Sequence, residues 1–579
     1  MIKIENLSYS FPQKDLFNEI TFTLEDGQHC ALIGTSGSGK STLVDMIMHH
    51  EKYLYDGKIE IGSSARIGYV DQYSHLNTKN DMTVYEYASE RFVQLQNEIA
   101  SICLEMETST DIEPLLKQYQ IALDTLDAMG GDDYESTINK QLNLADLGKR
   151  SDLKISHLSG GEFKLLQVIK EMLTLPSILI MDEPDAFLDF EHLNSLKDLI
   201  NSYKGILLVI THNRYLLNHC FNKIIHLENK DLQEYEGNYI HYKFSLLQQK
   251  IELHELAIAD SLEIERNELI INRLRAIASN NADASRGKTL NARVSLQKRL
   301  EEKRIKTPFV EIRKPEISFV TDHPIIDECI LKINDYSVSF DDILLEHVSF
   351  DLNSTDKVAL IGPNGTGKTT LLRDIYQSQH PSIELHKESR LAFLSQFQDE
   401  MLDHSNNILD EFYTLGFQSN QDIIDHILKF GFTEQDLYQK ISALSGGEKT
   451  MLQLAKISYG HANLLLLDEP SSHLDTYSQI ALEEAITSFN GAVLMVSHDF
   501  YTIANCVDYI LLIEDKNIRK ISIRKFRKMI YSKHFDKNYL EIEEKKRSVE
   551  TRTEIALKNN NITLAKTLSE ELEQLIQLL

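Results

Sequence analysis

Short apolar runs that end in polar residues recur along the chain and predict buried strands. Three kinds of run occur, and each occurs twice. One ends before a glycine-rich segment, one ends in an Asp-Glu pair, and one ends beside a histidine. They cover residues 31–33 and 358–361, 178–181 and 464–467, and 207–211 and 493–497, respectively. Two copies of one α/β domain are therefore expected.

Helical spacing of apolar residues marks two further regions. Residues 91–106 and 112–129 are polar with helically spaced apolar positions. This pattern predicts a helical hairpin that stands out from the first copy at about residues 90–130. The alternative is a longer helical subdomain with no role of its own.

A longer hairpin is expected between the two copies. Residues 243–279 contain neither glycine nor proline, and a second helical pattern covers 288–306. The polar residues and glycine within 280–287 mark the break between them. A helix of about 35 residues that rises about 1.5 Å per residue would reach roughly 50 Å.

Both glycine-rich segments match the phosphate-binding pattern G-x-x-x-x-G-K-[ST]. In such loops backbone N–H groups surround phosphate, the lysine reaches the outer phosphates, and the Ser or Thr hydroxyl binds Mg²⁺. The predicted nucleotide-binding residues are Gly34, Thr35, Ser36, Gly37, Ser38, Gly39, Lys40, Ser41 and Thr42, and Gly362, Pro363, Asn364, Gly365, Thr366, Gly367, Lys368, Thr369 and Thr370.

Further motifs follow each phosphate loop in the same order. They are Gln72 and Gln396, LSGGE at 158–162 and 444–448, Asp182-Glu183 and Asp468-Glu469, and His212 and His498. The signature serine precedes the aspartate by 23 residues in both copies, and the aspartate precedes the histidine by 30. The glutamine precedes the signature serine by 87 residues in the first copy and 49 in the second. About 38 additional residues therefore lie where the first hairpin is expected.

This order of motifs resembles the ATPase domain of the ATP-binding cassette superfamily, whose signature is the LSGGE segment. Two full cassettes on one chain, a charged linker, an insertion in the first cassette and no apolar run long enough to span a bilayer resemble the ABC-F family in particular. The resemblance implies a protein that acts on the ribosome, as a translation factor or as an antibiotic-resistance protein. The short insertion in the first cassette, the long linker and the C-terminal extension favour the antibiotic-resistance subgroup.

The expected fold is α/β, with two ABC-type P-loop ATPase domains in tandem, joined by a long helical-hairpin linker and followed by a C-terminal helical extension. The expected domains are the first cassette at 1–242 with its arm at about 90–130, the linker at 243–322 with its tip at about 280–287, the second cassette at 323–522, and a basic and then helical extension at 523–579.

The resemblance also implies that the two cassettes pair head to tail within a monomer. The site built on Lys40 would be completed by Ser445, Gly446 and Gly447, and the site built on Lys368 by Ser159, Gly160 and Gly161. ATP would then join the cassettes, and its hydrolysis would release them.

Roles within each site follow from the chemistry of the side chains. Asp182 and Asp468 are expected to hold Mg²⁺ together with Ser41, Thr369, Gln72 and Gln396, because a hard cation prefers oxygen. The expected catalytic residues are Glu183 and Glu469 as bases, His212 and His498 at the γ-phosphate, and Gln72 and Gln396 as sensors of metal and water. Phe11 and Phe340 are candidates to stack on adenine, although each could equally be a core aromatic.

The two copies differ after the Asp-Glu pair. The second copy continues Pro470-Ser471-Ser472-His473-Leu474-Asp475, whereas the first has Phe187 in the place of His473. We therefore expect unequal hydrolysis rates, with the first copy the more atypical.

The charge distribution bears on the partner. The net charge of −28 argues against nucleic acid, yet residues 273–306 carry ten Lys or Arg and three acids. Such a patch suits a phosphate backbone, although a solvated helix face is the alternative. The RNA-binding candidates are Arg286, Lys288, Arg293, Lys298 and Arg299. A second basic run at 516–537 precedes an extension that could touch RNA or close the second cassette.

Five scattered cysteines without a CxxC pair indicate a reducing compartment, and the N-terminus lacks the pattern of a secretory signal. We expect a cytoplasmic ATPase with ATP and Mg²⁺ as cofactors. In its ATP-closed state it would bind the ribosome, at rRNA and tRNA, and insert its linker, to displace antibiotics or to modulate translation. The alternatives are the ATPase subunit of a membrane exporter and a cassette protein of nucleic-acid repair.

Overall fold

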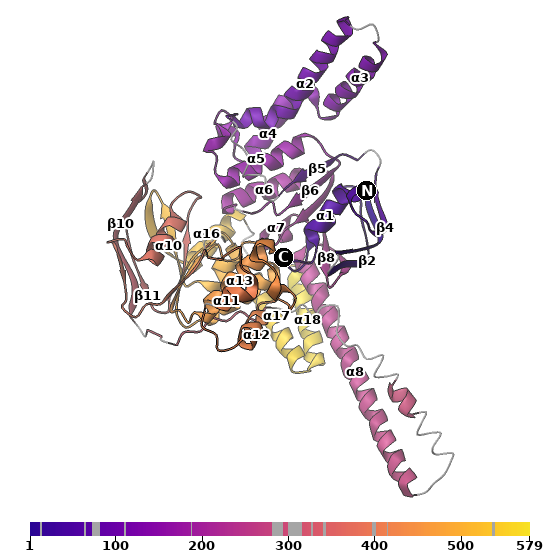
Figure 1. Ribbon diagram of the computed structural model, residues 1–579, viewed down its shortest axis with the longest axis vertical. Coiled ribbons are helices and arrows are strands. Elements are labelled where there is room, and N and C mark those ends of the chain that lie inside the picture. The colour runs from indigo at the N-terminus through magenta and orange to yellow at the C-terminus, as the bar shows by residue number, and fades with distance from the viewer. Residues whose placement is uncertain are drawn as a thin grey trace. The chain divides into compact units, whose positions relative to one another are not determined.

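The computed structural model describes residues 1–11, 14–62, 65–71, 81–108, 112–186, 188–280, 293–298, 315–322, 324–325, 328–339, 343–395, 401–413, 415–534 and 539–578 (Figure 1). The chain divides into two compact units. One comprises Met1–Asn238 and Lys314–Lys528, and the other comprises Tyr239–Arg313 and Met529–Leu579. Both copies of the repeat therefore fold into a single unit.

The first cassette contains a six-stranded sheet in the order β5-β6-β7-β3-β8-β9 and a three-stranded antiparallel sheet in the order β2-β1-β4. Its strands are β1 (Ile2–Phe11), β2 (Lys14–Leu24), β3 (His29–Ile33), β4 (Asp56–Ile61), β5 (Ile67–Val70), β6 (Ile178–Asp182), β7 (Ile206–Ile210), β8 (Lys223–Glu228) and β9 (Asp231–Glu236). Its helices are α1 (Lys40–Met48), α2 (Val84–Thr108), α3 (Glu113–Ala128), α4 (Tyr134–Leu144), α5 (Gly160–Leu173), α6 (Phe190–Ser202) and α7 (Arg214–His219).

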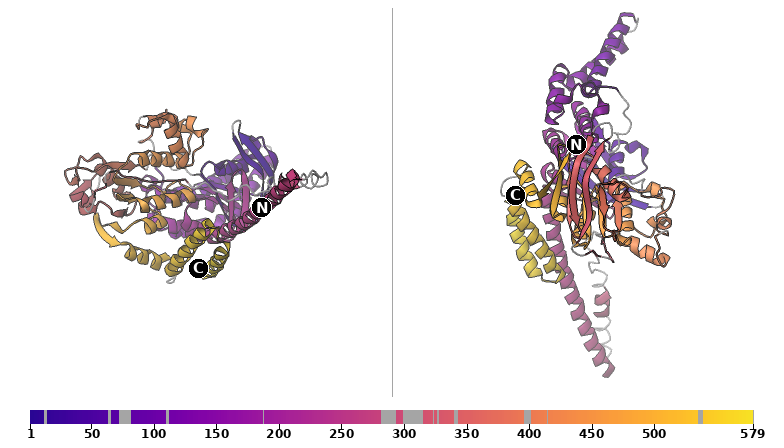
Figure 2. Two further views of the ribbon diagram at one scale, coloured as in Figure 1. Left: turned by 90° about the horizontal axis from the view of Figure 1, so that it is seen from below. Right: turned by 90° about the vertical axis from the view of Figure 1, so that its left-hand side faces the viewer.

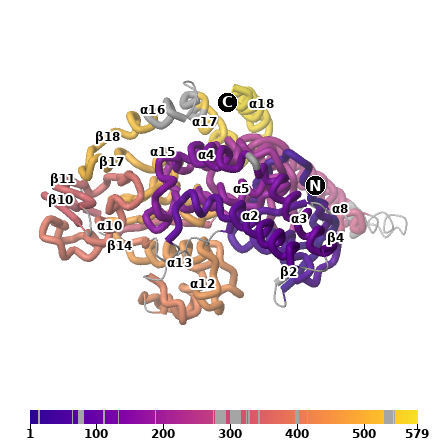
Figure 3. Tube along the Cα trace, turned by 90° about the horizontal axis from the view of Figure 1, so that it is seen from above, coloured from indigo at the N-terminus to yellow at the C-terminus, as the bar shows by residue number. Residues whose placement is uncertain are grey.

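The second cassette repeats this design, with the sheets β14-β15-β16-β12-β17-β18 and β11-β10-β13. Its strands are β10 (Cys329–Ser339), β11 (Ile343–Asn353), β12 (Lys357–Ile361), β13 (Ile383–Leu385), β14 (Leu391–Leu394), β15 (Leu464–Asp468), β16 (Ala492–Val496), β17 (Tyr509–Glu514) and β18 (Asn517–Ser522). Its helices are α10 (Lys368–Gln377), α11 (Ile408–Tyr413), α12 (Asn420–Lys429), α13 (Gly446–Tyr459), α14 (Thr476–Ser488) and α15 (Phe500–Cys506), and α16 (Ile523–His534) follows. Strands β10 and β11 run side by side (Figure 3).

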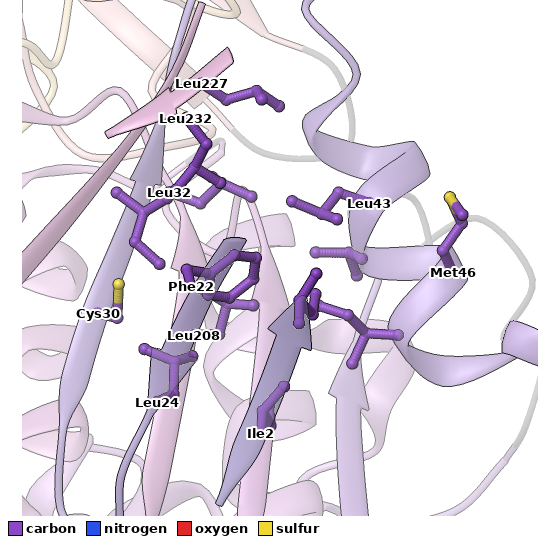
Figure 4. Packing of buried hydrophobic residues seen from close by; sticks show 14 of the residues in the cluster. Ile2, Phe22, Leu24, Cys30, Leu32, Leu43, Met46, Leu208, Leu227 and Leu232 are labelled. Atoms are coloured by element: carbon purple, nitrogen blue, oxygen red, sulfur yellow. The ribbon is translucent and has the colours of Figure 1, made fainter. Parts of the chain in front are cut away.

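The core explains why the central strands read as unbroken apolar runs. In each large sheet all pairings are parallel except that of the last strand, and every residue of β6, β7, β15 and β16 is buried. Strands covered on both faces need apolar side chains at successive positions. Leu32 and Leu208 from the sheet pack with Phe22 of β2 and Leu43 of α1 (Figure 4). The carboxyl ends of the parallel strands therefore share one edge, where the polar motifs collect.

The insertion of the first cassette forms two helices that lie side by side, α2 and α3 (Figures 1 and 2). At the base of α2, the ring of Phe92 stacks on Tyr134 with centroids 4.8 Å apart. Farther along, Leu104, Leu116 and Ile121 are exposed. The hairpin is thus anchored at one end and presents scattered apolar side chains at the other.

The second unit is helical. It contains the 42-residue α8 (Tyr239–Asn280), a helical segment at 293–298, and the paired helices α17 (Tyr539–Lys558) and α18 (Ile562–Ile576). Residues near the start of α8, such as Ile251, share a core with Leu568 and Leu572 of α18. Farther along α8, Asn267 donates a 2.7 Å hydrogen bond to Gln297. The C-terminal extension therefore packs on the linker helix.

The structure confirms the α/β class with two ABC-type sheets in tandem and a long helical region. Among the described residues, no helix is both long and apolar enough to cross a membrane.

Candidate ATP sites

Each phosphate loop joins the end of a central strand to the start of a helix, between β3 and α1 and between β12 and α10. The residue before each helix is a glycine in the left-handed region, with φ of +100° at Gly39 and +88° at Gly367. A Cβ on Gly39 would lie 2.7 Å from the side chain of Leu16. Glycine is therefore required there, and the turn leaves the N-terminus of α1 open to an anion.

The two loop lysines are buried and folded over their own loops. Lys40 Nζ donates to the carbonyls of Gly34 and Thr35 at 3.0 and 2.9 Å, and Lys368 Nζ donates to those of Gly362 and Pro363 at 2.8 Å each. Burial lowers the pKa of both ammonium groups, against the pull of nearby carboxylates. Each loop thus holds its cation directly above its backbone.

Acidic pairs end β6 and β15. Burial, assisted by the neighbouring Glu183, raises the pKa of Asp182 to about 6, while a hydrogen bond from Ser41 opposes the rise. Glu183 and Glu469 both adopt the left-handed backbone, with φ of 44° and 50°. This conformation costs a non-glycine residue on the order of 1–3 kcal/mol. Its presence at the same position of both copies indicates that each glutamate is held in a fixed direction.

The two histidines follow β7 and β16. Burial lowers the pKa of His212 to about 4 and that of His498 to about 3, so both rings are neutral near pH 7. The backbone N–H of His498 donates to Glu469 Oε2 at 3.2 Å, and its Nε2 lies 3.5 Å from Oε1. In the second cassette the predicted base and the predicted phosphate contact are thus adjacent.

The first site is completed by the second cassette. Ser36 Oγ lies 2.9 Å from Ser445 Oγ, and Ser36 N donates to Asp475 Oδ2 at 3.4 Å. A Cβ on Gly447 would lie 3.1 Å from Ser36 Oγ. Ser445 also caps α13 in a capping box with Glu448, so the positive end of α13 faces the phosphate loop.

The glutamate of the first site also meets the second cassette. His473 Nδ1 lies 3.2 Å from Glu183 Oε2. Burial, the largest influence, would raise the pKa of Glu183, but the hydrogen bond with His473 and nearby positive charge outweigh it and lower the pKa. In contrast, burial and Asp468 raise the pKa of Glu469 to about 8.

The second site meets the first cassette through Asp189, whose charge acts on Lys368 and His498. Ser159 caps α5 in its own capping box, with Gly160 and Gly161 beginning the helix. No hydrogen bond joins these three residues to the second phosphate loop in the part of the chain that the structure describes. Asp189 thus belongs to the first cassette in sequence but borders the second site.

The donor set fits a triphosphate with Mg²⁺. The hydroxyl of Ser38 is buried and has no hydrogen-bond partner among the described residues. The Ser41 hydroxyl and the Asp182 carboxylate lie within hydrogen-bonding reach of each other and supply the oxygen ligands that Mg²⁺ prefers. The second loop offers Lys368, Thr369 and Asp468 in the corresponding positions.

Of the adenine candidates, Phe11 is 44% exposed, and its ring lies edge-on to Tyr9 with centroids 5.2 Å apart. Phe340, Gln72, Gln396 and Phe187 lie outside the described residues. So do three of the RNA-binding candidates, Arg286, Lys288 and Arg299. Of the other two, Lys298 is exposed and Arg293 is partly buried, and both lie in the helical segment at 293–298.

Sequence reasoning compared the segments that contain His473, Asp475 and Asp189 but assigned no site role to these three residues, which line the sites. The signal was present in the repeat, because the six residues after Glu183 align with the six after Glu469 and both end in Leu-Asp. Glu228 was also omitted. It accepts hydrogen bonds from the backbone and side chain of Thr35 at 3.0 to 3.1 Å. Glu228 belongs to none of the recurring motifs, so no signal in the sequence pointed to it.

Comparison with known proteins agrees with this geometry. A family model described as ABC transporter matches residues 17–186 and 345–472. The uncharacterized ABC transporter ATP-binding protein YfmM of Bacillus subtilis (strain 168) is 30% identical over 511 residues, which are 86% of this chain and 96% of that protein. The energy-dependent translational throttle protein EttA of Escherichia coli (strain K12) is 28% identical over 527 residues, 87% of this chain and 90% of EttA.

A plant relative, ABC transporter F family member 2 of Arabidopsis thaliana, is 28% identical over 546 residues, which are 89% of this chain and 76% of the relative. Among solved structures, the archaeal ribosome recycling factor aABCE1 in complex with the stalk protein aP1 aligns with a TM-score of 0.56 at 17% identity. The alignment covers 91% of this chain and 92% of that one, and it shows a shared fold.

Two P-loop domains with the first site lined by both define a tandem ATP-binding-cassette protein. The chain belongs to the ABC transporter family, and its relatives include a member of the F family of these proteins.

Proposed function

We propose that this protein hydrolyses ATP to ADP and phosphate at two sites between its cassettes and binds the ribosome while the cassettes are closed. The observation that carries the proposal is the 2.9 Å approach of Ser36 and Ser445, which belong to different cassettes. A γ-phosphate held there would touch both halves, so that occupancy favours closure and hydrolysis favours opening. The relative EttA, a translational throttle protein, supports the ribosome as the partner.

The residues divide the chemistry between them. Lys40 and the N-termini of α1 and α13 bind the negative charge of the phosphates, and Lys368 does so in the second site. Glu183 and Glu469 orient water; Glu183, whose pKa is lowered, accepts its proton, and Glu469 does so in its ionised form. His212 and His498 contact the γ-phosphate. Ser41 with Asp182, and Thr369 with Asp468, would hold Mg²⁺, which neutralises phosphate charge when bound. Gln72 and Gln396 complete these sites, and Phe11 and Phe340 stack on adenine.

The basic linker supplies the RNA contact in this proposal. Arg293 and Lys298 lie on the helical segment next to α8, and the residues beyond them continue the positive patch. Insertion of the linker into an RNA-rich site would displace bound antibiotics or modulate translation. The chain would work as a monomer in the cytoplasm.

Co-sedimentation with ribosomes tests the proposal. The variant Glu183→Gln/Glu469→Gln should form a complex that needs ATP and weakens steeply with salt. The control Lys40→Ala/Lys368→Ala should not form it, because it binds ATP poorly. Binding that is independent of ATP would contradict the proposal. Recovery with membranes or with DNA would favour an exporter subunit or a repair protein instead.

The RNA contact made by the linker and the displacement of antibiotics need a separate test. Arg293→Glu/Lys298→Glu should reduce ribosome binding and the salt dependence, whereas the control Glu263→Gln, at an exposed acid of α8, should change neither. Antibiotic susceptibility is then compared between cells that lack the gene, cells that express the protein and cells that express the double variant. Equal susceptibility in all three would exclude antibiotic displacement and leave a role in translation.

A further inference from the structure

A buried arginine joins the two cassettes at a place that contains no phosphate loop and no signature segment. Arg214, the first residue of α7, is 9% exposed. Its Nη2 contacts the carboxylate of Glu483 in α14 and lies 3.1 Å from Asp499 Oδ2. Its guanidinium also lies over the ring of Tyr501, 4.8 Å from the centroid. One side chain of the first cassette is therefore held by three residues of the second.

The acidic partners of Arg214 are themselves fixed in place. Glu483 accepts a 2.7 Å hydrogen bond from Asn505 and a 3.3 Å bond from Thr502. Asp499 accepts from Thr502 at 2.9 Å and caps α15 by accepting from Tyr501 N at 2.9 Å. The guanidinium thus enters a preformed polar network, and its position fixes the start of α15.

Arg214 and its partner Asp499 each lie within two residues of a histidine that we propose to contact the γ-phosphate. Arg214 follows Asn213, which caps α7 through the N–H of Tyr215 at 3.0 Å, and Asn213 follows His212. On the other side, Asp499 follows His498, whose N–H donates to Glu469. A displacement of either histidine loop would therefore move, or be resisted by, the same ion pair.

The repeat shows that this connection is one-sided. From the signature segment onward, corresponding residues of the two cassettes are 286 positions apart, as Ser159 and Ser445 and also His212 and His498 are. By that spacing the counterpart of Arg214 is Phe500, that of Asp499 is Asn213, and that of Glu483 is Lys197. The cation and both anions are thus placed in opposite cassettes, and their symmetry-related positions cannot form the same ion pair.

Interface stability alone does not explain a buried charge cluster. Removing two or three charges from water costs as much as their attraction returns, and apolar residues of similar size would serve equally well. Apolar contact is already present beside the cluster, where Phe190 and Phe500 have centroids 6.4 Å apart. What a hydrogen-bonded ion cluster adds is a defined relative position of the groups that it joins.

We propose that Arg214 is a positioning residue that couples the two ATP sites, by linking the His212 loop of the first cassette to the His498 loop of the second. This inference rests on the proposed ATPase activity. In the coupled molecule, a change at one site alters turnover at the other. Without the arginine the two sites hydrolyse independently.

A mutant cycle measures this coupling. Turnover is determined for the parent, Glu183→Gln and Glu469→Gln, with the double variant as the background rate. The turnovers of independent sites add, so the turnover of the parent divided by the summed turnovers of the two single variants gives a coupling factor, which equals one without coupling. We expect a factor of at least about fivefold in the parent, the lower end for coupled sites. In the Arg214→Met background it should fall below about twofold. Arg214→Lys, which keeps the charge but loses the planar fork, should retain part of it.

Two further variants keep the test decisive. Asn218→Ala removes another contact between the cassettes, the 3.1 Å hydrogen bond to the hydroxyl of Tyr501, and should keep the full coupling factor. If Arg214→Met unfolds because it leaves Glu483 uncompensated, Arg214→Met/Glu483→Gln removes both charges and should still lose coupling. A parent without coupling, or coupling that survives in the double variant, would overturn the inference. A parent without any turnover would instead refute the proposed ATPase activity.

Discussion

Nδ1 of His473 lies 3.2 Å from Oε2 of Glu183, although the two residues belong to different cassettes. The corresponding position of the first cassette is Phe187, which cannot offer a hydrogen bond to Glu469. The pKa of Glu183 is lowered and that of Glu469 is raised, in accord with this difference. Glu183 therefore has a hydrogen-bonding partner in the other cassette, whereas the corresponding residue of the first cassette could not supply one to Glu469.

The His473→Phe substitution should make the first site resemble the second. We expect turnover at the first site, measured in the Glu469→Gln background, to fall by about tenfold or more, because a buried carboxylate loses its hydrogen-bond donor. The reciprocal change, Phe187→His in the Glu183→Gln background, should raise turnover at the second site. Steady-state ATP hydrolysis at saturating ATP reports both. Equal effects of His473→Phe on both sites would contradict the assignment.

A bulky residue at the signature serine should block closure of one site only. In Ser445→Arg, the side chain would occupy the space next to Ser36, since the two hydroxyls are 2.9 Å apart. We expect at least a tenfold loss of turnover at the first site and a smaller ATP-dependent change in the distance between fluorophores on the two cassettes. Ser458→Arg, at the other end of α13, serves as the control. An unaltered distance change in Ser445→Arg would argue against closure at this contact.

Gly39→Ala should impair ATP binding through backbone strain. Its φ of +100° and the 2.7 Å approach to Leu16 leave no room for a methyl group. The strain of about 1–3 kcal/mol should lower the affinity for ATP by about tenfold or more. Gly62→Ala is the matched control, because no atom lies within 4 Å of its added Cβ. Isothermal titration with a non-hydrolysable ATP analogue measures the affinity of each variant, and thermal unfolding measures its stability. Similar affinities in the two variants would contradict the role of backbone strain at Gly39.

The buried His226 should make the first unit sensitive to acid. Burial lowers the pKa of His226 to about 4 from an ordinary value of 6.5. A histidine with a depressed pKa stabilises the fold above its unfolded pKa and loses that contribution as the pH falls. We therefore expect a loss of about 3 kcal/mol between pH 6.5 and 4. His226→Gln should flatten the dependence of Tm on pH over this range. The same slope in both proteins would assign the acid sensitivity to other groups.

Much of the cassette fold follows directly from the sequence. The apolar runs at 31–33 and 358–361 lie within β3 and β12, since strands buried on both faces admit few polar residues. The phosphate loops could also be predicted from the sequence. The backbone at Gly39 and Gly367 lies in the left-handed region, which favours glycine, so the motif carries glycines at fixed positions. Local constraints of this kind can be recognised in a single amino-acid sequence.

The individual side-chain contacts between the cassettes could not be predicted from the sequence. Arg214 and Glu483 are 269 positions apart, and neither belongs to a recurring motif. Their attraction depends on the docking of two surfaces, which no local pattern records. The packing of α18 on the start of α8 is hidden for the same reason, since it joins the linker to the far end of the chain.

The fusion of both cassettes into one polypeptide has an evolutionary consequence. In a symmetric homodimer every substitution appears at both sites, so Phe and His could not stand at matching positions of one assembly. A duplicated gene that stays joined escapes this constraint. Each catalytic centre can acquire or lose a side chain by itself, and one can drift toward a timing or sensing role while the other retains fast chemistry.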